Sequence, residues 1–291
     1  MADKPPAAAK PPKKAKGPGS KPDLASIAGV VVAVGGILGG LILEGGNVKD
    51  VAQVTAAIIV LGGTLGAVMV TTPMSTLLSA GKKLGTVFFD KAQNPSSIIE
   101  EIITYATKAR REGIVSLEKD ANSIQDPFLR KSLNLAVDGT DLQQIRKIME
   151  LEISLFEHHG EAEAKVYESA GGYAPTIGII GAVMGLIQVM KNLADIDQVG
   201  HGIAVAFVAT VYGVGVSNLF FLPAASKIKA RVQNVIQMKE LMLEGVIAIV
   251  EGQNPKLIRS KLEVYSQEHA PKKKKAAKAE KPAAQPAAAK G

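Results

Sequence analysis

Several residue types that support enzyme chemistry are missing from this chain. It has no cysteine in 291 residues, which excludes a disulfide framework, a thiolate nucleophile and a cysteine-ligated zinc cluster. Neither a nucleophile elbow nor a phosphate-binding loop is present. No metal-ligand spacing exists among its four histidines, which are His158, His159, His201 and His269. These absences argue against an enzyme and against a resident metal or cofactor.

Charged residues are also missing from four long apolar runs, which cover 24–43, 51–70, 169–190 and 203–223. At 1.5 Å per residue, a helix of about 20 residues crosses the roughly 30 Å of hydrocarbon in a bilayer. With 47% hydrophobic residues, 29 glycines and no tryptophan, the chain is richer in small apolar residues than a typical soluble domain. The sequence therefore predicts an all-α membrane protein with four transmembrane helices.

The rest of the chain divides into a helical insert between the second and third spans, residues 73–168, and C-terminal helices at 224–268. Capping boxes that begin at Ser97 and Thr140 predict helix starts in the insert. No proline occurs between Thr140 and Pro175, so the last insert helix is expected to run straight into the third span. Helical spacing of apolar residues predicts a long amphipathic helix after the fourth span.

Basic residues set the predicted orientation. Lysines precede the first span and follow the second and fourth, whereas the two hairpin connections carry only Lys49 and Lys191. The positive-inside rule therefore places both termini, the insert and the C-terminal helices in the cytoplasm. The Lys-, Pro- and Ala-rich tails, residues 1–22 and 269–291, are predicted to be disordered. They lack interleaved aromatic residues, which favours solvated tails or contact with the lipid surface over nucleic-acid binding.

Small residues recur at helical spacing along the third span. Pro175 interrupts this seam and has no N–H for the carbonyl of Gly171, so we expect a kink and a free backbone acceptor there. The alternative is that the small residues serve only for helix packing and that the helix tolerates the proline. The seam, which lets other helices approach closely, consists of Gly171, Ala174, Gly178, Gly181, Gly185 and Gln188.

None of the four runs contains the carboxylate that a protein carrying protons or cations alone would ordinarily need. Either the chain moves no ions, or a helix of a partner brings the titrating group. The fourth span carries a small, weakly polar face that is predicted to lie beside such a partner helix, and it is formed by Ala206, Thr210, Gly213 and Ser217. The alternative for Thr210 is ordinary helix packing, with its hydroxyl bonded to a backbone carbonyl one turn back.

Three stretches together resemble the MotA/PomA family, the larger stator subunit of the bacterial flagellar motor in the MotA/TolQ/ExbB superfamily. They are RREGIVSLE at 110–118, APTIGIIGAVMGLI at 174–187 and ATVYGVGVSNLFFLP at 209–223. Their order and spacing agree with the family over roughly 24–262. The resemblance implies a homo-pentamer in the bacterial inner membrane around a dimer of a MotB/PomB-type subunit, whose single membrane helix brings the ion-carrying aspartate.

The resemblance also implies roles for individual residues. The family's two prolines, which couple ion flow to movement, fall on Pro175 and Pro223. Its cytoplasmic charges that meet the rotor switch-complex protein FliG fall on Arg110 and Glu118. Without the resemblance, these two residues would be interpreted as an exposed charge pair on a helical insert.

Ion preference follows from two further positions. Sodium-driven members resemble one another in having threonine at both, and here these positions hold Ala182 and Thr210. A dehydrated sodium ion would lack a ligand at Ala182, so protons are favoured over a sodium-driven PomA-type stator. A TolQ/ExbB-type energiser of the outer membrane is a further alternative, but usually has three spans. A non-transporting scaffold would need no partner carboxylate.

Overall fold

The computed structural model describes residues 21–90 and 94–267. Strands β1 (Lys21–Pro22) and β2 (Phe89–Asp90) pair in antiparallel fashion in the order β1-β2, with Lys21 opposite Asp90. The rest of the described chain is helical apart from its turns. The tails predicted to be disordered lie outside the described residues except for Lys21 and Pro22. For these two residues the prediction is wrong, because their backbone pairs with β2.

The elements follow one another along the chain with short connections. In the first half they are α1 (Leu24–Leu43), α2 (Val48–Val51), α3 (Val54–Ala57), the π-helical η1 (Ile58–Gly62), α4 (Gly63–Thr71), α5 (Met74–Lys83), α6 (Gly85–Phe88), α7 (Pro95–Glu112), the 3-10 helix η2 (Ile114–Leu117), α8 (Glu118–Ala121) and α9 (Pro127–Val137). In the second half they are α10 (Leu142–Lys191), α11 (Ile196–Val216), the π-helical η3 (Ser217–Phe221), α12 (Leu222–Val250) and α13 (Pro255–Gln267).

Four helical stretches are long and apolar enough to cross a membrane, as predicted: Leu24–Leu43, Val54–Thr71, Leu142–Lys191 and Ile196–Val250. Two boundaries differ from the sequence prediction. The second span begins at Val54 rather than at residue 51, because the helix is interrupted after α2. The helix of the fourth span begins at Ile196 rather than at residue 203, because the side chain of Asp195 caps it by accepting from two backbone amides.

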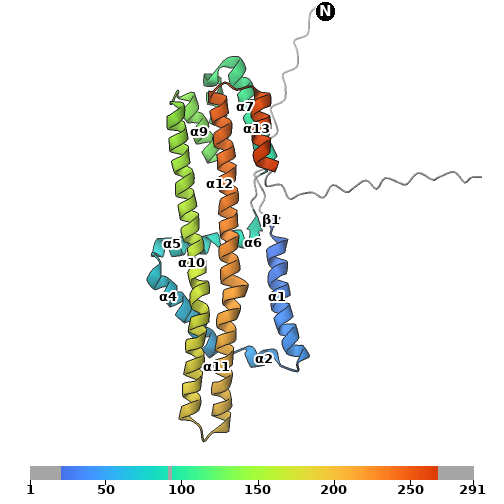
Figure 1. Cartoon of the computed structure of the whole chain (residues 1–291), viewed down its shortest axis with the longest axis vertical. Helices are drawn as coiled ribbons and strands as arrows, with labels where there is room; N and C mark the ends of the chain where they lie inside the picture. The colour runs from blue at the N-terminus through green and yellow to red at the C-terminus, as the bar shows by residue number, and fades with distance from the viewer. Residues whose placement is uncertain (1–20, 91–93, 268–291) are drawn as a thin grey trace, which may run out of the picture.

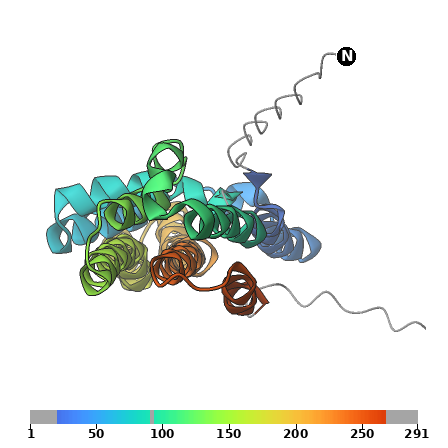
Figure 2. The same cartoon turned by 90° about the horizontal axis from the view of Figure 1, so that it is seen from above.

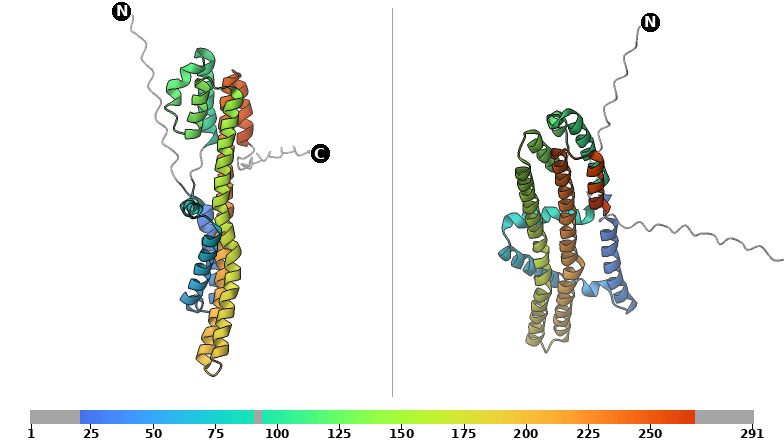
Figure 3. Two further views of the ribbon diagram at one scale, coloured as in Figure 1. Left: turned by 90° about the vertical axis from the view of Figure 1, so that its left-hand side faces the viewer. Right: turned by 45° about the horizontal axis from the view of Figure 1, so that its top comes forward.

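α10 forms the backbone of the molecule. Its 50 residues run from the insert through the third span without interruption, as predicted, and at 1.5 Å per residue it is about 75 Å long. α11, η3 and α12 return beside it as one continuous helical course from residue 196 to residue 250. Figures 1 and 3 show these two courses side by side, joining the apolar end of the molecule to the insert.

α1 stands apart from this pair (Figures 1 and 2). None of its residues is buried, so the helix is held mainly at its start. There the side chain of Asp23 caps the helix by accepting from the Ser26 amide, and it pairs with Lys227 and Arg231 of α12. The Asp23 amide also donates to Phe88 O over 2.7 Å. The first span is therefore tied to the return helix just beyond the apolar run.

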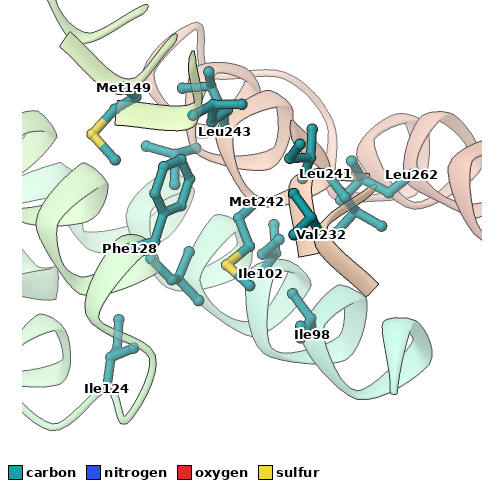
Figure 4. Packing of buried hydrophobic residues seen from close by; sticks show 14 of the residues in the cluster. Ile98, Ile102, Ile124, Phe128, Met149, Val232, Leu241, Met242, Leu243 and Leu262 are labelled. Carbon is teal, nitrogen blue, oxygen red and sulfur yellow. The ribbon is translucent and has the colours of Figure 1, made fainter. Parts of the chain in front are cut away.

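The insert has its own apolar core, between α7, α9, α10 and α12. Ile102, Met149 and Met242 are almost fully buried there, and Phe128 packs beside them (Figure 4). Complete burial of such a side chain contributes about 1.5–3 kcal/mol. α13 closes the core against α7, where Arg259 forms a bidentate ion pair with Glu100. This core fixes the insert to the membrane-distal halves of α10 and α12.

Helices begin close to both predicted starts, but with different caps. Asn94 caps α7 by accepting from the Ser96 amide, and Asp141 caps α10 by accepting from the Gln143 amide. The predicted capping boxes are therefore wrong in their N-cap residue. In each case an Asn or Asp within three residues of the predicted cap accepts from the amide two residues further on, which serves the same purpose. The hydroxyl of Ser97 instead donates to the Asn94 carbonyl.

Candidate functional site

The small-residue seam of α10 packs against α11. A Cβ on Gly178 would lie 2.9 Å from Ala209 O, and one on Gly185 would lie 2.7 Å from Gly202 O. Only glycine permits this approach of two backbones without a shift. Gln188, the last predicted member of the seam, is exposed instead. The buried members are Gly171, Ala174, Gly178, Gly181 and Gly185.

The residues predicted for the ion pathway gather at one level of this helix pair. The Cα of Thr210 lies 3.5 Å from the position of a Cβ on Gly178. Gly178 follows Pro175 by three residues and precedes Ala182 by four, so all three positions lie within about one helical turn of the same contact. Pro175, Ala182 and Thr210 are each half-buried. They lie at the edge of the packed seam, where another helix can reach them.

The hydroxyl of Thr210 donates to Ala206 O over 3.2 Å, one turn back in its own helix. This is the geometry of the packing alternative, and it leaves only the lone pairs of the hydroxyl for another group. The rest of the predicted polar face is not available to a partner. Ala206, Gly213 and Ser217 are buried, because this face turns towards α10. Of that face, Thr210 alone stays half-exposed.

The carbonyl of Gly171, which Pro175 leaves without a helical donor, is not free. The hydroxyl of Ser217 donates to Gly171 O over 2.6 Å, from η3 across the helix pair. The prediction of a free acceptor is therefore wrong, because a neighbouring helix supplies the missing donor. α10 accordingly continues through Pro175 as one unbroken helix.

Pro223 lies two residues after the end of the π-helical turn η3. The amide of Leu222 bonds to the carbonyl of Ser217, five residues back. This widened turn lets the helix continue past Pro223, which has no amide hydrogen to donate. The side chain of Leu222 then fills the space beside Gly171, where a Cβ would lie 2.6 Å from Leu222 Cδ2. The two proline sites are therefore in direct contact.

Tyr212 has a structural role that no local pattern in the sequence indicates. Its hydroxyl donates to Val51 O and accepts from the Gln53 amide, across the interruption between α2 and α3. A side chain of α11 thus supplies hydrogen bonds to the backbone groups at the break before Val54. The Tyr212 hydroxyl therefore explains how backbone groups at the start of the second span are paired close to the apolar region.

The two predicted rotor-contact residues lie far from this region. Arg110 is near the end of α7 and Glu118 begins α8, at the end of the molecule away from the α10–α11 connection (Figure 1). Both are exposed, and neither forms an ion pair within the described ranges. Their neighbours Lys108 and Asp120 pair with each other over 2.7 Å. The charges of Arg110 and Glu118 thus remain available to another molecule.

Arg110 also lines a cavity of about 370 Å³. Its walls come from the ends of α7, α9 and α12, and they include Gly139 and Gly252, two glycines with positive φ that follow helix ends. Across residues 21–90 and 94–267 no three acidic or histidine side chains gather as a metal site would require. His269 lies outside those residues.

Comparisons with known proteins match most of the chain. The profile of the "MotA/TolQ/ExbB proton channel family" matches residues 120–241, and that of "Motility protein A N-terminal" matches residues 27–113. Motility protein A of Bacillus subtilis (strain 168) is 35% identical over 248 residues, covering 84% of this chain and 90% of that protein.

Solved structures agree with these matches. The structure of C. jejuni MotAB has a TM-score of 0.81 at 33% identity, covering 86% of this chain and 98% of that one. The structure of the flagellar MotAB stator complex from Bacillus subtilis has a TM-score of 0.77 at 34% identity, covering 83% of this chain and 95% of that one.

These matches confirm a flagellar stator subunit of the expected four-span type and a channel protein rather than an enzyme. Together they cover the first hairpin, the insert and the third and fourth spans. By its identity to relatives of nearly the same length, the chain belongs to the motility protein A family of the MotA/TolQ/ExbB proton channels.

Proposed function

We propose that this chain combines with a MotB-type subunit to form a proton channel that converts ion-motive force into torque on the flagellar rotor. One observation carries the proposal. The apolar runs of all four spans lack Asp, Glu, Lys and Arg, although the chain belongs to a proton channel family. The titrating group must therefore come from another chain. The description of the solved relatives as MotAB supports a MotB-type second subunit as that chain.

The partner's carboxylate would move along the edge of the α10–α11 pair. Protonation neutralises the carboxylate and lowers the cost of passing an apolar wall. Pro175, Ala182 and Thr210 lie half-buried at that edge. Each charge that crosses the membrane supplies roughly 2.3 kcal/mol per 100 mV, which is the work available for a step. The two prolines then couple passage of the ion to movement of the helices.

Protons fit this edge better than sodium. Ala182 offers no side-chain oxygen, so the hydroxyl of Thr210, whose hydrogen is directed to Ala206 O, is the single side-chain oxygen at these two positions. A dehydrated sodium ion needs several oxygen atoms to replace its water shell. A proton needs only a carboxylate and water, so it makes no such demand. No resident metal or cofactor takes part in this mechanism.

Arg110 and Glu118 would transmit each step to the rotor protein FliG. This requires the insert, the C-terminal helices and both termini to lie in the cytoplasm, on the inner face of the bacterial inner membrane. Lys82 and Lys83 at the end of α5, and Lys227 and Lys229 beyond the fourth span, support that orientation. A homo-pentamer around a partner dimer would cover the apolar faces that a single chain leaves exposed.

The test is the swimming speed of cells that rely on this subunit and its partner. Speed is first measured across a range of sodium concentrations at fixed pH, and then with a protonophore. We expect speed to be independent of sodium and to vanish with the protonophore. Speed that rises with sodium would overturn the assignment of protons and favour a PomA-type stator. The match of residues 27–113 to the motility protein A N-terminal profile already counts against an outer-membrane energiser.

A further inference from the structure

We propose that Ser217 links the two proline sites into one mechanical joint, so that movements at Pro175 and Pro223 occur together. Ser217 is a positioning residue in this proposal, since it touches neither the ion nor the partner's carboxylate. The coupling of the joint to torque rests on the proposed function. The existence of the joint does not, and it can be tested on the purified complex.

The side chain of Ser217 serves the first proline. Pro175 cannot donate to Gly171 O, and Ser217 Oγ donates to that oxygen instead over 2.6 Å. Ser217 is only 1% exposed, so no water replaces the bond. In an apolar surrounding, an unpaired carbonyl is costly. The Pro175 site in α10 is therefore completed by a residue that belongs to the other helix.

The backbone of the same residue serves the second proline. Ser217 O accepts from the Leu222 amide across η3, the π-helical turn that precedes Pro223. Turns of this kind often mark functional positions within helices. The two oxygens of Ser217 thus hold the hydrogen bonds of two separate proline sites. A change in the position of Ser217 alters both sites at once.

Close packing reinforces this link. Leu222 Cδ2 lies in the space that a Cβ on Gly171 would need, at 2.6 Å. A Cβ on Gly213 would lie 2.6 Å from Ala174 O, so the helices are also in backbone contact one turn away. The segments around the two prolines therefore cannot slide past each other independently. A rotation of α10 at Gly171 must either carry Ser217 with it or break its hydrogen bond.

The choice of acceptor is informative. A serine in a helix commonly bonds a carbonyl three or four residues back in its own helix. Gly213 O lies in that position, yet the hydroxyl of Ser217 bonds to Gly171 O. Ser132 provides the contrast, because it is equally buried but bonds to Leu129 O in its own helix. The contact of Ser217 is thus a bond between helices and not ordinary back-bonding.

A double-mutant cycle on the purified complex tests the joint. In Pro175→Ala the new amide can bond Gly171 O and takes over the task of Ser217. We expect Ser217→Ala to lower the Tm by about 2–5 °C in the protein that keeps Pro175, and by less than half of that in the Pro175→Ala variant. Ser132→Ala is the matched control, and its shift should be equal in both backgrounds because distant sites are additive.

Equal Tm shifts for Ser217→Ala in the two backgrounds would overturn the joint. If Pro175→Ala does not assemble, Pro175→Gly restores the same amide and completes the cycle. If Ser217→Ala does not assemble, Ser217→Cys, a weaker donor, takes its place.

The torque role has its own readout, which is swimming speed under viscous load. Ser217→Ala and Pro223→Ala should each slow the cells at least twofold, and the double variant should be no slower than the worse single variant. If Ser217→Ala cells swim at normal speed although the Tm shifts differ between the two backgrounds, the joint has only a structural role and its coupling to torque is overturned. The Arg110→Glu variant distinguishes a failure of the joint from a failure of the proposed function. Normal swimming of Arg110→Glu would refute the rotor contact, but it would not affect the result of the Tm cycle.

Discussion

Asp23 Oδ2 lies 2.6 Å from Lys227 Nζ, and this ion pair joins the start of α1 to α12. Arg231 reaches the same oxygen at 2.9 Å. Hydrogen bonding from Lys227 lowers the pKa of the Asp23 carboxyl to about 2, against the opposing effect of desolvation and with help from the Ser26 amide and the charge of Arg231. Because no residue of α1 is buried within the chain, these contacts largely decide where the first span begins.

The attachment of α1 should therefore weaken in acid. The folded pKa of Asp23 lies below its ordinary value of 3.8, so its contribution is complete above that pH and is lost as pH falls towards 2. Amide exchange of the first turn of α1, followed from pH 5 down to 2 and compared with the intrinsic rate at each pH, should show a falling protection factor. Asp23→Asn should exchange fast already at pH 5. Equal protection in the two proteins would contradict this attachment.

Gly178→Ala should loosen the contact between α10 and α11. The added Cβ would lie 2.9 Å from Ala209 O, a backbone atom that can move only with its helix. We expect a loss of about 1–3 kcal/mol, measured as thermal stability of the complex. Gly172→Ala is the control on the same helix, because nothing lies within 4 Å of its Cβ. That variant should be neutral or slightly stabilising, since alanine favours helix. Similar losses in both variants would show that close approach is not the cause.

Tyr212→Phe should destabilise the segment between α2 and α3. Removing the hydroxyl leaves Val51 O and the Gln53 amide with only the 3.2 Å bond that they form with each other, at a cost of about 1 kcal/mol. The direct measurement is hydrogen exchange at the Gln53 amide, which should become faster. Tyr173→Phe is the control, because no hydrogen bond of its hydroxyl exists in the described part of the chain. Unchanged exchange in Tyr212→Phe would contradict the proposed role of this residue.

Arg110→Glu should abolish or strongly reduce swimming without affecting assembly. Arg110 is exposed and makes no ion pair within the described residues, so its reversal should change stability by no more than about 0.5 kcal/mol. Glu118→Lys should act in the same way. Lys147→Glu reverses an exposed charge on α10 and should swim normally. A motility loss in all three variants would point to a general charge effect in place of a rotor contact.

Composition and periodicity are enough to predict the four spans and the passage of α10 from the insert into the membrane. They also identify Gly171 O as the carbonyl that Pro175 leaves without a donor. They cannot name its new donor, because Ser217 lies 46 residues away and the pairing depends on how α10 and α11 align. The same holds for Tyr212 and Val51, which are 161 residues apart. Contacts set by the alignment of packed helices have no local signal in the sequence.

Errors at the element ends have a different origin. The N-caps are short-range features, but several polar residues compete for each, so that Asn94 replaces Ser97 and Asp141 replaces Thr140. The strand β1, which consists of Lys21 and Pro22, is too short to produce a recognisable pattern in the sequence. The fold brings the segments around the two prolines into contact, through Gly171, Ser217 and Leu222, and leaves the charges of Arg110 and Glu118 exposed at the far end. Their roles in ion flow and rotor contact stay predictions.

The length of α12 has a consequence for the size of a motor step. This helix starts at the proline site, and Val250 at its other end lines the same cavity as Arg110. In the proposed mechanism its 29 residues would act as a lever arm of about 43 Å, so a tilt of about 10° at its base would swing the tip by about 7.5 Å. In the proposed mechanism the stroke at Arg110 would therefore be set by the length of α12, and a small displacement within the bilayer would be amplified at the far end of the insert.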